Sequence, residues 1–147
     1  MTVLDVSRFG DGLLVVNYRD NQAFIEPTTP QVWIPVVSMD NIQNIKAHVL
    51  AWTITETDEK GRERAYLRAI IHHKGIVENK LFKLTENRTS DVSQYRIGNE
   101  VPLSLFEEFA DLEPVIETGV NDFLVVPVHN LITSDRVTGF DDYEDID

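Results

Sequence analysis

The sequence predicts a mainly β fold: an antiparallel meander in a sandwich or partly open barrel, with one or two short helices. Two observations lead to this prediction. Apolar and β-branched runs are short and recur at short intervals, and residues that favour turns separate them. The 147 residues are 42% hydrophobic, which suffices to build one core. We therefore expect a single β-rich domain over residues 1–147.

The first part of the chain predicts a hairpin followed by an edge strand. Gly12–Tyr18 is an apolar, β-branched run, and Asp20-Asn21 suits a hairpin turn before a second strand at Ala23–Ile25. Gln31–Val37 is another candidate strand. Its Pro35 lacks a backbone N–H, which indicates either an edge strand or a strand break.

The middle of the chain predicts a three-stranded antiparallel meander. Val49–Thr55, Ala65–His73 and Ile76–Leu84 are rich in residues that favour strands. A polar loop with Gly61 joins the first two, and Lys74-Gly75 forms a two-residue turn between the last two.

The flanking segments are less regular. Asn41 onwards predicts a short turn or helical start before the meander, and Asn87–Asp91 predicts a loop. Apolar residues three apart in Leu103–Phe109 predict a short helix that ends by Glu113-Pro114. Phe123–Val128 predicts a last strand that contains a proline.

Composition excludes several classes of protein. There is no cysteine, which rules out disulfides, thiol catalysis and cysteine metal sites. No apolar run reaches the roughly 18 residues of a membrane-spanning helix, and the first residues do not read as a secretory signal. The 25 acidic residues outnumber 13 basic ones, giving a net charge of −12. Such a chain repels phosphate, so we expect no direct nucleic-acid binding.

The histidines do not predict a metal site. His72 and His73 are neighbours in a predicted strand, so their side chains point to opposite faces and cannot easily share one ion. His48 and His129 lie elsewhere in the sequence. A zinc site needs three or four ligands that converge, and nothing in the spacing provides them.

The sequence does not predict a catalytic or cofactor-binding site either. The acid pairs Glu107-Glu108 and Asp141-Asp142 are sequence neighbours, whereas a glycosidase needs two carboxyl groups across a cleft. Gly10-Asp11-Gly12 precedes a strand, whereas a phosphate-binding loop joins a strand to a helix. Ser7 and Ser134 lack the flanking glycines of a nucleophile elbow. We therefore expect no enzyme activity, no catalytic, cofactor-binding or metal-binding residues, and no cofactor.

Three aromatic residues allow two interpretations. Trp33, Trp52 and Phe24 either form a platform for a ligand or belong to the core, and core packing is the commoner role of aromatic residues in strands.

The end of the chain resembles a segment of the portal proteins of tailed bacteriophages. Val126–Asn130 is similar to a strand that ends in a Pro-x-x-Asn-like turn in that family. After a polar spacer, Gly139-Phe140-Asp141-Asp142 is similar to the Gly-x-Ser-Asp-like start of a helix, although Asp141 replaces the serine. Acidic residues at this position suit the first turn of a helix. The rest of the chain resembles the β-rich wing of the portal in the same order, through Phe9–Tyr18, the Pro-rich stretch Glu26–Val37, the meander and Leu103–Pro114.

This resemblance implies a fragment of a longer, structural portal-like chain from a phage or prophage. The family forms a homo-oligomeric ring at one capsid vertex, through which DNA is packaged and ejected. The implied partners are other copies of the chain and the capsid, scaffolding and terminase proteins. The implied location is the virion, which assembles in the bacterial cytoplasm. The alternative, from another class, is a small β-barrel module that binds a protein or peptide.

Overall fold

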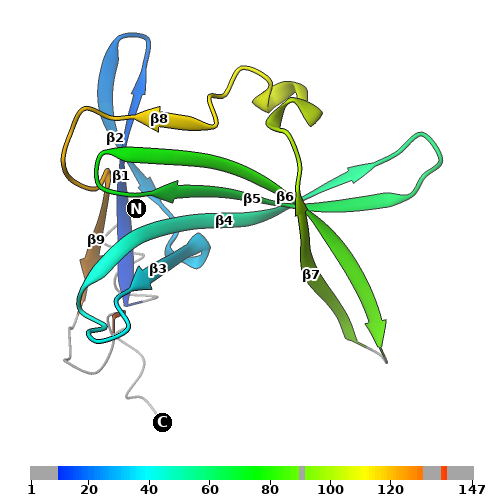
Figure 1. The fold of residues 1–147 in the computed structure, drawn as a ribbon, viewed down its shortest axis with the longest axis horizontal. Coiled ribbons are helices and arrows are strands. Elements are labelled where there is room, and N and C mark those ends of the chain that lie inside the picture. Colours follow the sequence, from blue (N-terminus) through cyan, green and yellow to red (C-terminus); the bar gives the residue numbers. More distant parts are fainter. Residues whose placement is uncertain (1–9, 90–91, 131–136, 139–147) are drawn as a thin grey trace.

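The structure is a computed structural model that describes residues 10–89, 92–130 and 137–138. It confirms the mainly β prediction: two antiparallel sheets form the molecule, and they do not close into a barrel (Figure 1). One sheet has the strand order β2-β1-β9, and the six-stranded sheet has the path β3-β4-β5-β6-β7 with β8 paired to β6. The strands are β1 (Asp11–Arg19), β2 (Gln22–Thr28), β3 (Trp33–Val37), β4 (Ile45–Thr57), β5 (Glu63–His72), β6 (Ile76–Thr89), β7 (Val92–Glu100), β8 (Val115–Glu117) and β9 (Val125–His129).

The hairpin of β1 and β2 forms as the sequence predicts. Asp20 and Asn21 connect the strands with φ angles of 50° and 63°. Two consecutive positive φ angles are the signature of a type I′ turn, whose twist matches that of the strands it joins. On the other side of β1, β9 pairs antiparallel through residues such as Val125, which lies opposite Val15.

The predicted meander is confirmed as β4, β5 and β6. Leu50 lies opposite Ile70, and Ile70 lies opposite Asn79, so the three strands run in continuous antiparallel register. The predicted two-residue turn is present as well, closed by the His73 N–H, which donates to the Ile76 carbonyl at 2.9 Å.

Prolines mark the outer strands. Pro27 lies in β2, Pro35 in β3 and Pro127 in β9, and each of these strands pairs with one neighbour in its sheet. A proline has no N–H to donate to a second neighbour, so these strands suit the sheet edges. The edge-strand interpretation of Pro35 is therefore the one that the structure supports.

Two strands were missed by the sequence prediction. Asn87–Asp91 was expected to be a loop, but β6 continues to Thr89 and pairs with β7. The prediction failed because β7 reads Val-Ser-Gln-Tyr-Arg-Ile-Gly-Asn-Glu, which is too polar to show a strand pattern. The short β8 was missed for a different reason: three exposed residues are too few to show a strand pattern, and only pairing with β6 defines it.

The predicted helix at Leu103–Phe109 forms as two single 3₁₀ turns, η2 (Leu103–Leu105) and η3 (Glu107–Phe109). Phe106 between them is extended, with φ −112° and ψ 133°, which prevents a continuous helix. Apolar spacings of three suit the three-residue period of a 3₁₀ turn. A third turn, η1 (Pro30–Val32), precedes β3. The turn expected after Asn41 is short, since β4 already begins at Ile45.

Two small clusters of buried side chains make up the core. One joins the sheets and contains Leu13, Val15, Trp33, Leu50 and Val125. The other lies toward the opposite end of the six-stranded sheet, where η2 packs Leu103 against Tyr66 and Leu81. Figure 1 shows that the ends of β4 and β5, and of β6 and β7, extend from the body of the molecule as two separate arms.

Candidate functional site

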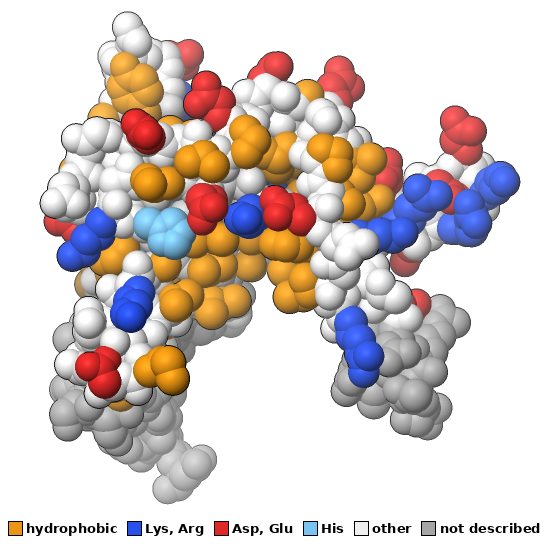
Figure 2. Space-filling view, viewed as in Figure 1, with side chains coloured by type: hydrophobic (Ala, Val, Ile, Leu, Met, Phe, Trp, Pro, Cys, Tyr) orange, Lys and Arg blue, Asp and Glu red, His pale blue; other side chains and the backbone are white. Residues whose placement is uncertain are grey.

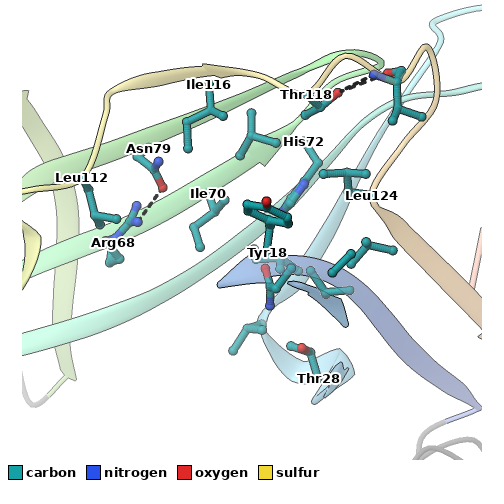
Figure 3. A pocket seen from close by; sticks show the side chains of 18 of the residues that line it. Tyr18, Thr28, Arg68, Ile70, His72, Asn79, Leu112, Ile116, Thr118 and Leu124 are labelled. Carbon is teal, nitrogen blue, oxygen red and sulfur yellow. Dashed lines mark hydrogen bonds between the residues drawn. The ribbon is translucent and has the colours of Figure 1, made fainter. Parts of the chain in front are cut away.

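A groove of about 890 Å³ lies between the two sheets. One wall is the face of β4, β5 and β6 that carries Leu50, Ile70 and Val77, and the facing wall is formed by β1 and β2. The segment around β8 supplies Leu112 and residues 116–120. Most of the lining is aliphatic or aromatic, which is typical of a binding site. The polar side chains among the lining residues include Arg68, His72 and Asn79 (Figure 3).

Arg68 is the most unusual residue in this groove. It lies on β5 with 3% of its surface exposed, at one end of the groove beside Leu112 (Figure 3). Its Nη1 donates to the carbonyl oxygen of Ala69 at 2.6 Å and to that of Lys80 at 3.3 Å. Its Nη2 donates to Asn79 Oδ1 at 2.7 Å. Two strands thus hold the guanidinium in place.

Two aromatic rings complete the surroundings of this guanidinium. Its carbon atom lies 5.2 Å from the ring centroid of Phe109 and 5.9 Å from that of Trp52. A cation is attracted to the face of an aromatic ring, which offsets part of the cost of burying it.

The charge of Arg68 nevertheless has no carboxylate partner among the described residues. No ion pair links it to an acid there, and its Nε–H is buried without an acceptor. Burial lowers the pKa of Arg68 from its ordinary value. Since buried charges in proteins are normally paired, this arrangement indicates a place for an anion.

Asn79 connects Arg68 to the segment before β8. While its side-chain oxygen accepts from Arg68, its Nδ2 donates to the Glu113 carbonyl at 2.9 Å. Its backbone N–H donates to the Pro114 carbonyl at 2.8 Å. The rim of the groove and the guanidinium are therefore fixed by the same side chain.

His72 provides the second polar atom without a partner. It is buried on β5, lines the groove, and its Nδ1 makes no hydrogen bond to the described residues. Burial lowers the pKa of His72 to about 4, with smaller contributions from His48, directly opposite on β4, and from His73. His72 is consequently neutral at pH 7.

His48 and His129 make hydrogen bonds to other side chains within the fold. His48 Nδ1 accepts from the Trp33 indole N–H at 3.1 Å, and burial lowers the pKa of His48. His129 is hydrogen-bonded to the buried carboxylate of Asp11, its cross-strand neighbour. The fold thus brings His48 and His72 together, which sequence spacing did not predict. Within the described part of the chain, no three ligand side chains form a metal-binding group.

The other residues considered from sequence do not form a site. Glu107 and Glu108 are exposed on η3, while Asp141 and Asp142 lie outside the described residues, as do Ser7 and Ser134. Gly10, with φ 77°, leads into β1 as a turn residue.

The three aromatic residues lie in different environments. Trp33 is buried in the core between the sheets, as the core interpretation predicts. Trp52 lies beside Arg68 in the groove, and the Arg19 guanidinium covers the ring of Phe24 at 4.5 Å.

Arg68 and Asn79 were not identified from sequence, although a signal exists. Tyr66, Arg68, Ile70 and His72 occupy alternate positions of one strand and so share a face. A charged residue in the middle of an otherwise inward-facing apolar series indicates a buried charge.

Comparison with known proteins identifies no relative. A scan against protein-family models finds no match, and a search of the curated proteins finds none either. Among the described residues, no helix is long and apolar enough to cross a membrane.

Proposed function

We propose that this chain is a structural, non-catalytic part of a phage or prophage portal-like protein, in which it packs against neighbouring subunits of a ring. The observation that carries this proposal is the outer face of the six-stranded sheet, opposite the groove. Figure 2 shows a belt of apolar side chains across the body of the molecule, with a short row of acidic and basic side chains in its middle.

The strand register explains this belt. Ile34, Val49 and Ile71 lie side by side in one row across β3, β4 and β5. Ala51 and Ala69 form the next row, and Leu67 lies opposite Phe82 beyond it. On β6 the first two rows continue into Glu78 and Lys80, which form an ion pair, so the outer face is apolar mainly over β3, β4 and β5. An antiparallel sheet normally presents a polar face to water, so this apolar area favours a second packing partner.

The arms support the same proposal. The end of β6 and β7 is a two-stranded ribbon on which Tyr95 and Ile97 are exposed. Two strands alone are marginally stable in water and gain stability by packing on another surface. The ordered resemblance to portal wings, including β9 with Pro127 followed by Asn130, indicates which kind of assembly supplies that surface.

The test is the oligomeric state of the full-length gene product by multi-angle light scattering. We expect a closed ring from the full-length protein and a monomer or weak dimer from the 147 residues alone. Ile34→Asp in the full-length protein should weaken ring formation, because it places a charge in the apolar belt.

Ile25→Asp is the matched control for that variant. Ile25 is 64% exposed on β2 and Ile34 is 55% exposed on β3, so the chemical change is the same on a different sheet. A full-length protein that remains monomeric under assembly conditions would rule out the portal proposal. Terminase and capsid genes beside the encoding gene would support it independently.

A second candidate function, a protein- or peptide-binding module, is favoured by the groove and by the unpaired charge of Arg68 within it. The two functions are compatible, since a ring subunit also binds protein segments.

A further inference from the structure

We propose that the groove between the sheets docks an extended segment of a partner protein in which one Asp or Glu stands between apolar side chains, its carboxylate pairing with Arg68. This inference does not depend on ring formation. It rests on the geometry of the guanidinium, the lining of the groove and the apolar rim around it.

The hydrogen bonds of Arg68 to the described residues leave its Nε–H unused. Both carbonyl contacts are made by Nη1, and one of the two Nη2–H groups donates to Asn79. Nε–H has no acceptor in the described part of the molecule. Nε–H and Nη2–H form one side of the guanidinium fork, which suits the two oxygens of a carboxylate.

Arg68 lies at the end of the groove, where Leu112 stands beside it (Figure 3). Because Nε is closed off from solvent, a carboxylate reaches it only when a neighbouring side chain moves aside, and we propose that Leu112 does so. Leu112 belongs to the exposed segment between η3 and β8, so such a movement does not disturb the core clusters.

Beyond Arg68 the groove accepts apolar groups. Ile70, Val77, Ile116 and Leu124 line it along its length. His72 adds a ring that is neutral at pH 7 and therefore places no second cation there. Apart from Glu117 and a few uncharged polar residues, the lining thus favours apolar side chains on either side of the acid.

The rim favours a protein segment over a small organic acid. Tyr18 is 67% exposed and Val120 51% exposed, and both line the groove. A small ligand inside the groove would leave these side chains in water, whereas a polypeptide that passes over the rim would cover them. Buried arginines surrounded by apolar contacts are also frequent centres of protein interfaces.

The net charge of −12 restricts the partner further. A polyacidic segment would be repelled over a long range, so a single acid in an apolar context fits better than an acidic tract.

The first experiment uses three fluorescein-labelled peptides with the 147-residue chain. Each peptide carries Leu and Val around a central Glu, Gln or Lys, and binding is measured by fluorescence anisotropy. We expect the Glu peptide to bind at least about tenfold more tightly than the Gln peptide, and the Lys peptide to bind most weakly. Equal affinities for Glu and Gln, or no binding by any peptide, would overturn the proposal.

Variants of the chain test whether the preference for the Glu peptide arises in the groove. Arg68→Met should remove the preference for Glu over Gln. Since Arg68 is buried and its loss can affect folding, Ile116→Asp provides a second variant on an exposed wall residue, where a new carboxylate should repel the Glu peptide. Ile25→Asp, which does not line the groove, is the control and should bind as the unmodified chain does. Unchanged binding by Ile116→Asp would place the peptide elsewhere.

A competition experiment distinguishes a protein segment from a small organic acid as the source of the carboxylate. Octanoate is added to the complex with the Glu peptide. We expect octanoate to displace the peptide only weakly, because it leaves the rim uncovered. Octanoate that binds as tightly as the peptide would assign the groove to small organic acids and overturn the protein-segment proposal.

Discussion

His72 shows how the fold changes the chemistry of one residue. Its ring is buried on β5, opposite His48, and its Nδ1 has no hydrogen-bond partner in the described residues. A protonated ring would need solvation that this site does not provide, and a second imidazole nearby adds repulsion. Its pKa accordingly falls from 6.5 to about 4.

This shift predicts that the protein loses stability in mild acid. Above pH 6.5 the ring is neutral in both the folded and the unfolded chain, so its titration does not change the free energy of unfolding. Between pH 6.5 and pH 4 the unfolded chain binds the proton and the folded chain does not. The free energy of unfolding should therefore fall by up to about 1.4 kcal/mol per pH unit from this group.

Urea unfolding at pH 7 and at pH 5.5 measures this slope. His72→Gln removes the titrating ring and should make the slope shallower over that interval. The His72 ring signals in an NMR titration provide the direct check. Titration near pH 6.5 in the folded protein would contradict the explanation.

At the scale of single elements, the arm of β6 and β7 depends on a glycine. A Cβ on Gly98 would stand 2.8 Å from the backbone oxygen of Lys83, close to the irregularity in register between Phe82 and Leu84. Backbone atoms cannot move aside as a flexible side chain does, so only glycine fits this position without a shift of the ladder.

Gly98→Ala should destabilise the arm by about 1–3 kcal/mol, the usual cost of a forced overlap in a packed position. Hydrogen exchange should become faster for the amides of β7 and remain unchanged in the hairpin of β1 and β2. Asn99→Ala, at the next, exposed position, is the control. Equal protection of β7 in Gly98→Ala and in the unmodified chain would contradict this role.

The β1–β2 hairpin depends on its turn in a different way. Asp20 and Asn21 both have positive φ angles, which cost little for Asn, Asp and Gly and more for other residues. Asn21→Val should lower the free energy of unfolding by about 1–2 kcal/mol, whereas Asn21→Gly should preserve it. Thermal unfolding of the two variants tests this expectation. If Asn21→Val were as stable as Asn21→Gly, the left-handed geometry would not limit stability here.

At the scale of the whole molecule, the net charge of −12 predicts the response to nucleic acid. Basic residues do occur on the β4–β5 arm, but Asp58 pairs with Arg62 and Arg64 there. We expect no shift of double-stranded DNA in a gel at about 0.15 M salt. Binding that survives this salt concentration would mean that the arm acts as a local basic surface despite the overall charge.

Local sequence signals predicted much of the fold because they act over a few residues. The meander follows from alternating and continuous apolar runs, the hairpin from Asp20-Asn21 and the edge position of β3 from Pro35. Strand β7 could not be predicted in this way. Its sequence is mostly polar, its residues 95–100 are exposed, and it exists because β6 offers free backbone groups along its length.

The sequence by itself determined a mainly β chain without cysteine, strongly acidic, with prolines that suit sheet edges. Tertiary structure alone decided that Arg68 meets Asn79, Trp52 and Phe109 at the end of a groove. It also decided that the outer face of the same sheet carries apolar residues of β3, β4 and β5 beside the charged pair of Glu78 and Lys80 on β6. The physical reason is register: a strand pattern shows that alternate residues share a face, but only pairing with other strands shows what that face meets.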